Sequence, residues 1–141
     1  MKTASMSKFD YLYLGALIVQ LFVFIAGWDW LVMDIHNQVA LGGGGPDAQV
    51  FVAGLLPTIV AITFAISLGI WMLISVARWG FVRYILALLV LLSALSLVAE
   101  VIEPTMNVYF FAAYAIILAM NIAALYFVFQ PDAGAWIRRE T

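Results

Sequence analysis

The residues of this sequence with the most chemical potential are a few acids and a single histidine. Asp29, Asp34 and His36 lie within one short segment, and Glu100 and Glu103 lie three residues apart much later in the chain. Residues at this spacing on a helix share one face. Carboxylates are the ligands that hard divalent cations prefer, and imidazole suits copper. These five residues therefore form a candidate site for a cation or for copper on the outer face of a membrane.

A solvated acidic rim is the alternative interpretation of the same five residues, and we favour it. Their spacing matches no recognised metal motif, and acids are what remains on a membrane face from which basic residues are excluded. Two carboxylates and a histidine can transfer protons, but no nucleophile or oxyanion-binding feature accompanies them. We therefore expect no cofactor and no enzymatic activity.

A second group consists of polar side chains inside otherwise apolar stretches. Gln20 and Asn121 carry amides, and Thr58, Thr63 and Ser67 carry hydroxyls. In a membrane such groups either form hydrogen bonds between helices, which contribute about 0.6 and up to roughly 2 kcal/mol, or line a narrow polar path. We favour the hydrogen bonds between helices. Ionisable residues are missing at mid-membrane depth, so a proton-coupled antiporter is not expected.

Small residues recur at four-residue spacing in two of the apolar stretches. Their positions are Ala61, Ala65 and Gly69 in one stretch and Ala115, Ala119 and Ala123 in another. Small residues one turn apart allow membrane helices to approach closely. We expect both ridges to pack within the chain, and contact with another subunit is the alternative.

The composition places all these residues in a membrane protein. Of the 141 residues, 67% are hydrophobic and 10% are charged, whereas soluble domains have about 45–50% apolar and about 25% charged residues. A membrane-spanning helix needs about 20 mostly apolar residues. Four such stretches predict helices over residues 11–35, 50–77, 81–102 and 107–129. We therefore expect one all-α domain over residues 1–141, an integral membrane four-helix bundle with up-down-up-down topology.

The basic residues orient the expected spans. All of them precede the first span, separate the second from the third, or follow the fourth; they are Lys2, Lys8, Arg78, Arg83, Arg138 and Arg139. Cytoplasmic flanks of membrane helices retain Lys and Arg, so we expect both termini in the cytoplasm and the protein in a bacterial-type inner membrane. The chain has no cysteine, which excludes disulfides, thiolate metal sites and covalently attached c-type haem.

These features favour a non-catalytic membrane protein that acts as an accessory, regulatory or immunity-type subunit beside a larger membrane partner. Low polarity within the spans and the two small-residue ridges support this hypothesis. One alternative is a small oligomeric channel or carrier whose polar path is lined by the first, second and fourth spans. Another is an outer-face protein that binds a metal or another cation. The expected partners are the lipid bilayer and another membrane protein or further copies of the chain, and nucleic acid is not expected.

Overall fold

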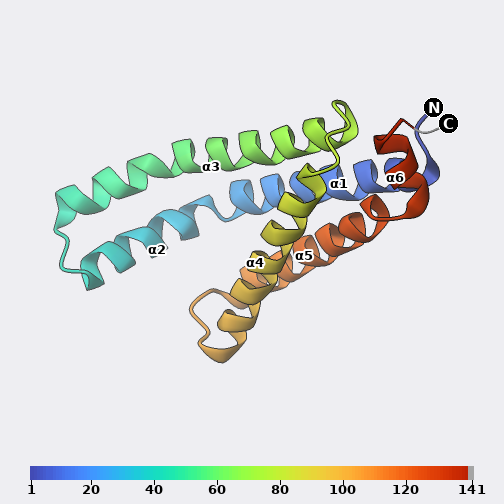
Figure 1. The fold of residues 1–141 in the computed structure, drawn as a ribbon. Coiled ribbons are helices and arrows are strands. Elements are labelled where there is room, and N and C mark those ends of the chain that lie inside the picture. The colour runs from blue at the N-terminus through green and yellow to red at the C-terminus, as the bar shows by residue number, and fades with distance from the viewer. Residues whose placement is uncertain (140–141) are drawn as a thin grey trace.

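The computed structural model describes residues 1–139, which form six helices and no strand (Figure 1). The helices are α1 (Ala4–Ala26), α2 (Trp28–Leu41), α3 (Pro46–Ser75), α4 (Val82–Ile102), α5 (Val108–Val128) and α6 (Pro131–Ile137). Four of them, α1, α3, α4 and α5, are long and apolar enough to cross a membrane. The all-α class predicted from the sequence is therefore confirmed, and the protein is a helical multi-pass membrane protein.

The first apolar stretch forms two helices instead of the single helix expected over residues 11–35. The break falls at Gly27, which is buried between α1 and α2. The ring of Phe110, from the first turn of α5, lies so close to Gly27 that a Cβ atom there would collide with it. Trp30 stacks on the same ring, with 4.5 Å between the ring centroids. Gly27 thus leaves the space in which Phe110, a residue far away in the sequence, packs against the junction of α1 and α2.

The bounds of the other spans differ less from the expected ones. α3 begins at Pro46 and ends at Ser75, against the expected range 50–77, because Gly45 caps it and proline is favoured in the first turn of a helix. It continues past Pro57 as one helix. α4 and α5 occupy nearly the ranges expected for the third and fourth spans.

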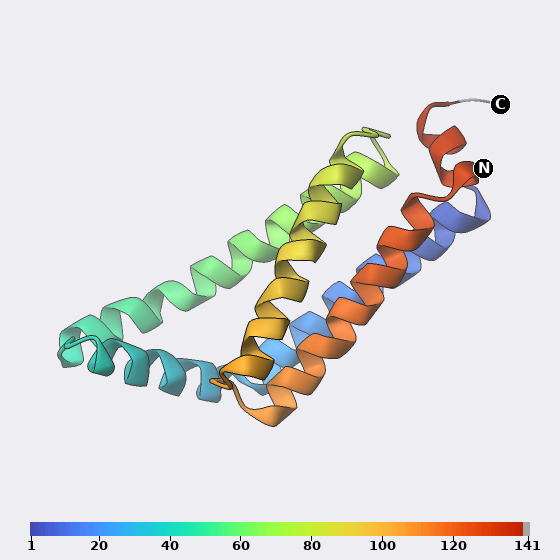
Figure 2. The same cartoon turned by 60° about the horizontal axis from the view of Figure 1, so that its bottom comes forward.

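Different helices meet at the two ends of the bundle. The start of α1, the α3–α4 connection and α6 lie together, and we call this region the basic end (Figure 1). The far end contains the α1–α2 junction and the α4–α5 connection (Figure 2). α1 and α5 pack against each other more extensively than any other pair of helices. α3 and α4 diverge from their short connection in both views.

The buried core lies at the basic end. Met6, Phe9, Ile74, Val82 and Val128 are each no more than 2% exposed, and they belong to one cluster. Along the rest of the spans, large apolar side chains remain exposed. This arrangement is stable in a bilayer because lipid tails are as apolar as the side chains that they touch.

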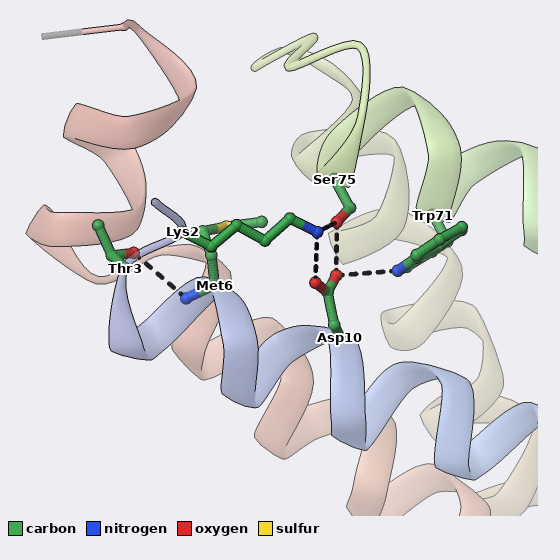
Figure 3. Close-up of polar contacts among 6 residues, drawn as sticks. All are labelled: Lys2, Thr3, Met6, Asp10, Trp71 and Ser75. Carbon is green, nitrogen blue, oxygen red and sulfur yellow. Dashed lines mark hydrogen bonds and ion pairs between the residues drawn. The ribbon is translucent and has the colours of Figure 1, made fainter.

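A polar network ties α1 to α3 within this core (Figure 3). Lys2 Nζ donates to Asp10 Oδ2 at 2.6 Å and to Ser75 Oγ at 2.5 Å. Ser75 Oγ and Trp71 Nε1 in turn donate to Asp10 Oδ1 at 2.6 and 2.9 Å. The Asp10 side chain is 16% exposed. Three donors therefore satisfy one largely buried carboxylate and hold the two helices in register.

The short helix α6 closes the basic end. The Asp132 carboxylate accepts a hydrogen bond from the Ser5 backbone N–H at 3.2 Å, which satisfies a free donor in the first turn of α1. Hydrogen bonds from Ser5 lower the pKa of the Asp132 carboxyl. Trp136 and Ile137 are buried against the core. Helix α6 thus stabilises the start of α1.

Asp10→Asn should lower the stability of the protein by about 1–3 kcal/mol, because the substitution removes the charge that Lys2 pairs with and weakens two further hydrogen bonds. Thermal unfolding in detergent, followed by circular dichroism, measures the effect. Asp47→Asn is the matched control, since Asp47 is exposed and makes no side-chain hydrogen bond to any described residue. Equal melting temperatures for the two variants would show that the network is not stabilising.

Candidate functional site in a cleft among the spans

A cleft of about 620 Å³ lies among the four spans. Its volume falls within the range of roughly 300–1,000 Å³ that is usual for small-molecule sites. Nine of its nineteen lining residues are polar, an unusual share for the interior of a membrane bundle. These nine are Tyr13, Gln20, Thr63, Ser67, Ser93, Ser96, Glu100, Tyr114 and Asn121.

Helical periodicity explains how α4 contributes to the cleft. Leu86, Val90, Ser93, Leu97 and Glu100 all line it and follow one another at intervals of three or four residues, so that they form one stripe along the helix. Sequence reasoning missed Ser93 and its neighbour Ser96. Their spacing from Glu100 was the available signal, because a helix places all three on the same side.

Two amides in the cleft lack hydrogen-bond partners within the protein. Gln20 of α1 and Asn121 of α5 line the cleft, and neither side chain forms a hydrogen bond to any residue in the range 1–139. The interhelical hydrogen bonds that we favoured for these two residues are therefore not formed. An unsatisfied polar group in hydrocarbon costs several kcal/mol. Both amides are therefore available to a molecule that enters the cleft.

Three hydroxyls of the cleft already donate hydrogen bonds to backbone carbonyls. Thr63 Oγ1 donates to the carbonyl of Ile59 at 2.9 Å, and Ser93 Oγ donates to the carbonyl of Leu89 at 2.9 Å. Both bonds stay within the helix and leave the oxygen lone pairs unused. Tyr13 donates across to α3, to the Ser67 carbonyl at 3.0 Å. The amides of Gln20 and Asn121 are thus among the donors that a solute would meet in the cleft.

Glu100 gives the cleft its charge. Its carboxylate accepts hydrogen bonds from the backbone N–H groups of Thr105 and Met106, at 3.0 and 3.2 Å, and from the Thr105 hydroxyl. It therefore shapes the α4–α5 connection and lines the cleft at the far end of the bundle. The lining contains no lysine, arginine or histidine. A negative potential in this setting favours neutral or cationic solutes over anions.

The cleft is closed toward the basic end and reaches the far end. Tyr13, Ile70, Leu86 and Val90 line it and also belong to the buried core cluster, which blocks it on that side. On the other side it extends to Met106 in the α4–α5 connection. Its width follows from the divergence of α3 and α4 (Figure 2). A single chain thus contains a blind cleft and not a continuous path.

The structure gathers most of the predicted intramembrane polar residues at this cleft. Gln20, Thr63, Ser67 and Asn121 all line it, although they come from three different spans. Thr58 does not line it and is exposed on the surface of α3. Four of the five predicted polar residues therefore line the cleft, and the fifth lies on the protein surface.

The small-residue ridge predicted on α3 does not pack within the chain. Ala61 and Ala65 are exposed. A Cβ atom added at Gly69 would meet nothing within 4 Å. The ridge is therefore free on the surface of the subunit, in contrast to the packing that we expected.

The ridge predicted on α5 only borders the main helix contact. Ala119 is exposed, and Ala115 and Ala123 are half-buried. The small residues that are buried on α1 and α5 are Ala16, which is 1% exposed, and Ala124, which is fully buried. The packing face of α5 thus lies one residue further along the chain than the spacing of small residues indicated.

The acidic residues and the histidine do not assemble into a metal site. The three residues of the first group all lie on α2, where the Asp34 carboxylate accepts a hydrogen bond from Gln38 Nε2 at 2.6 Å. Glu100 is occupied by the α4–α5 connection, and Glu103 is exposed at the end of α4. In the part of the chain that the structure describes, no three acidic or histidine side chains lie close enough to hold a metal ion. The break at Gly27 directs α2 away from α4 (Figure 2).

No family model matches the chain, and comparisons with curated proteins and with solved structures give no significant match. Function must therefore be argued from the cleft itself. Its lining offers hydrogen-bond donors and acceptors, apolar surface and one carboxylate. These groups can bind and orient a solute.

Water should reach the cleft but not the lipid-facing side of α4. Since the chain contains no cysteine, Ser93→Cys and Leu92→Cys introduce single thiols at adjacent positions, of which only the first lines the cleft. A charged, membrane-impermeant methanethiosulfonate reagent should label Ser93→Cys at least about tenfold faster, because thiolate forms poorly in hydrocarbon. Equal labelling rates in proteoliposomes would show that lipid fills the cleft.

Proposed function

We propose that this chain is a non-catalytic multi-pass membrane protein that binds a small neutral or cationic solute in the cleft among its spans. The observation that carries the proposal is the pair of unpartnered amides, Gln20 and Asn121, which two tightly packed helices present to one space. Membrane proteins rarely leave such groups unsatisfied. A bound solute satisfies them when the cleft is filled.

The proposed orientation places the basic end in the cytoplasm of a bacterial-type cell, with an up-down-up-down arrangement of the spans. The supporting observation is that the cationic side chains gather at this end, where Lys2 contacts the last turn of α3 and Arg78 stacks on Trp136 of α6. Basic residues remain on the cytoplasmic side of inner-membrane proteins. The cleft then opens toward the outer face.

The lining indicates the chemical class of the solute. Ten of the nineteen lining residues are apolar, the amides provide donors and acceptors, and Glu100 is the single formal charge. An amphiphilic molecule with an apolar body and a neutral or cationic polar group matches this pattern. Because the cleft is blind, a carrier that opens alternately to the two faces fits better than an open channel.

Binding of tetraphenylphosphonium tests this proposal, and tetraphenylborate serves as an anion of matching shape. Equilibrium dialysis of the detergent-solubilised protein should show saturable binding of the cation and at least about tenfold weaker binding of the anion. The double variant Gln20→Leu/Asn121→Leu should lose most of the cation binding. Thr58→Leu should retain it, since Thr58 lies outside the cleft.

The result that would reject solute binding in the cleft is equal affinity of the double variant and the parent protein for the cation. Circular dichroism of the double variant must show the helical content of the parent, so that loss of binding is not loss of folding. Equal binding of both ions would reject the assigned role of Glu100.

A second candidate function is that of an accessory subunit beside a larger membrane protein. The observation that favours it is the free ridge on α3, where Ala61 and Ala65 are exposed and Gly69 has open space above it. Small residues at this spacing allow a second helix to approach closely.

Ala65→Phe should abolish co-purification of a stoichiometric membrane partner from native membranes in mild detergent, because the larger side chain prevents close helix approach. Ala119→Phe is the control, as Ala119 is exposed on α5. Mass spectrometry of the purified complex identifies and quantifies the partner. Purification of the parent chain without a larger protein would contradict the accessory role.

A further inference from the structure

Two arginines at the basic end have no carboxylate partner among residues 1–139. The ion pair of this region joins Lys2 to Asp10, and Arg78 and Arg83 form none. The carboxylates described there are Asp10 and Asp132, which already accept the hydrogen bonds of the core network and of the first turn of α1. The basic end therefore carries an excess of positive charge that the described part of the protein leaves unpaired.

Arg83 is held in place by aromatic rings. Its guanidinium lies 5.2 Å from the ring centroid of Tyr84 and 5.0 Å from that of Phe129. Its Nε atom is buried and has no hydrogen-bond partner within the described chain. A buried charged donor without an acceptor is costly. Arg83 Nη2 donates to the Tyr84 hydroxyl at 3.4 Å. No carboxylate of the described chain pairs with this guanidinium, so its other Nη donors are left for an external acceptor.

Arg78 is held in an uncommon backbone conformation. Its φ angle is 59°, in the left-handed region that residues other than glycine rarely adopt. Its guanidinium lies 4.1 Å from the ring centroid of Trp136. Stacking on a ring leaves the N–H donors in the guanidinium plane available. Such local strain persists only where the surrounding structure enforces it, and here it presents a cation beside α6.

Gly134 of α6 lies beside the Arg83 guanidinium. A Cβ atom at this position would lie 3.7 Å from Arg83 Nη1 and 3.4 Å from Arg138 Nη1. Because Gly134 has no side chain, no Cβ atom occupies the space beside the Arg83 guanidinium.

We propose that the basic end binds the phosphate of an anionic phospholipid headgroup through Arg83 and Arg78 beside α6. Arginine donors form bidentate hydrogen bonds with phosphate oxygens. The source is a lipid because Arg83 lies in the first turn of a span, and exposed apolar rings beside it, Phe81 and Tyr84, are placed to contact acyl chains. Basic pockets on the cytoplasmic side of membrane proteins bind such headgroups.

This site is separate from the cleft and shares with the proposed function only the cytoplasmic orientation of the basic end. Binding of phosphatidylglycerol and of tetraphenylphosphonium can be measured on the same preparation. Failure of one measurement leaves the other informative, because the lipid site and the cleft have no lining residue in common.

Native mass spectrometry of the purified protein, titrated with phosphatidylglycerol or phosphatidylcholine, tests the lipid site. The parent should retain one phosphatidylglycerol at least about tenfold more tightly than phosphatidylcholine, and Arg83→Lys should lose most of this preference, because lysine keeps the charge but not the planar fork. Lys8→Gln should keep the preference, since Lys8 lies over the Phe127 ring and contacts neither Arg78 nor Arg83 in any described interaction. Arg83→Lys also preserves the basic flank of the span, so its insertion should be unchanged.

Three outcomes would overturn the proposal. Equal retention of the two lipids by the parent would exclude selection of an anionic headgroup. An equal loss in Lys8→Gln and Arg83→Lys would show that diffuse charge, and not the arginine pair, attracts the lipid. Displacement of phosphatidylglycerol by millimolar inorganic phosphate would assign the site to a free anion instead of a membrane lipid.

Discussion

The Asp10 carboxylate is the constraint on which the arrangement of the spans depends. It lies in the first span, is largely buried, and accepts hydrogen bonds from Lys2, Trp71 and Ser75. A buried charge is stable only when its partners are in place, so α1 and the end of α3 must stay together at this point. The same region contains the buried core and the docking site of α6. The bundle is therefore fastened at its basic end.

The cleft lies where α3 and α4 separate from each other. α1 and α5 remain in contact, whereas α3 and α4 separate toward the far end (Figure 2). In water such divergence would expose apolar surface at a large cost. In lipid it costs little, because hydrocarbon is an equivalent neighbour for apolar side chains. The polar groups between the diverging helices are what a solute encounters there.

The sequence predicts part of this cleft for a clear physical reason. Gln20, Thr63, Ser67 and Asn121 stand out because polar residues are rare in spans, and all four line the cleft. Ser93 and Ser96 were overlooked because serine is common in membrane helices and forms hydrogen bonds within its own helix, as Ser93 does with the Leu89 carbonyl. Whether the amides of Gln20 and Asn121 bond to each other or line a cleft depends on how α1 and α5 are rotated about their axes. The sequence of one apolar segment does not determine that rotation.

By itself the sequence determined that this is an all-helical membrane protein with four apolar spans, because span length and hydrophobicity are properties of contiguous residues. Only the tertiary structure decided how these helices meet. It breaks the first span at Gly27 through the ring of Phe110. It moves the α1 contact on α5 to Ala124 and leaves the α3 ridge free. It also keeps the acids and His36 apart. Each of these outcomes depends on contacts between residues distant in the chain, and local periodicity carries no information about such contacts.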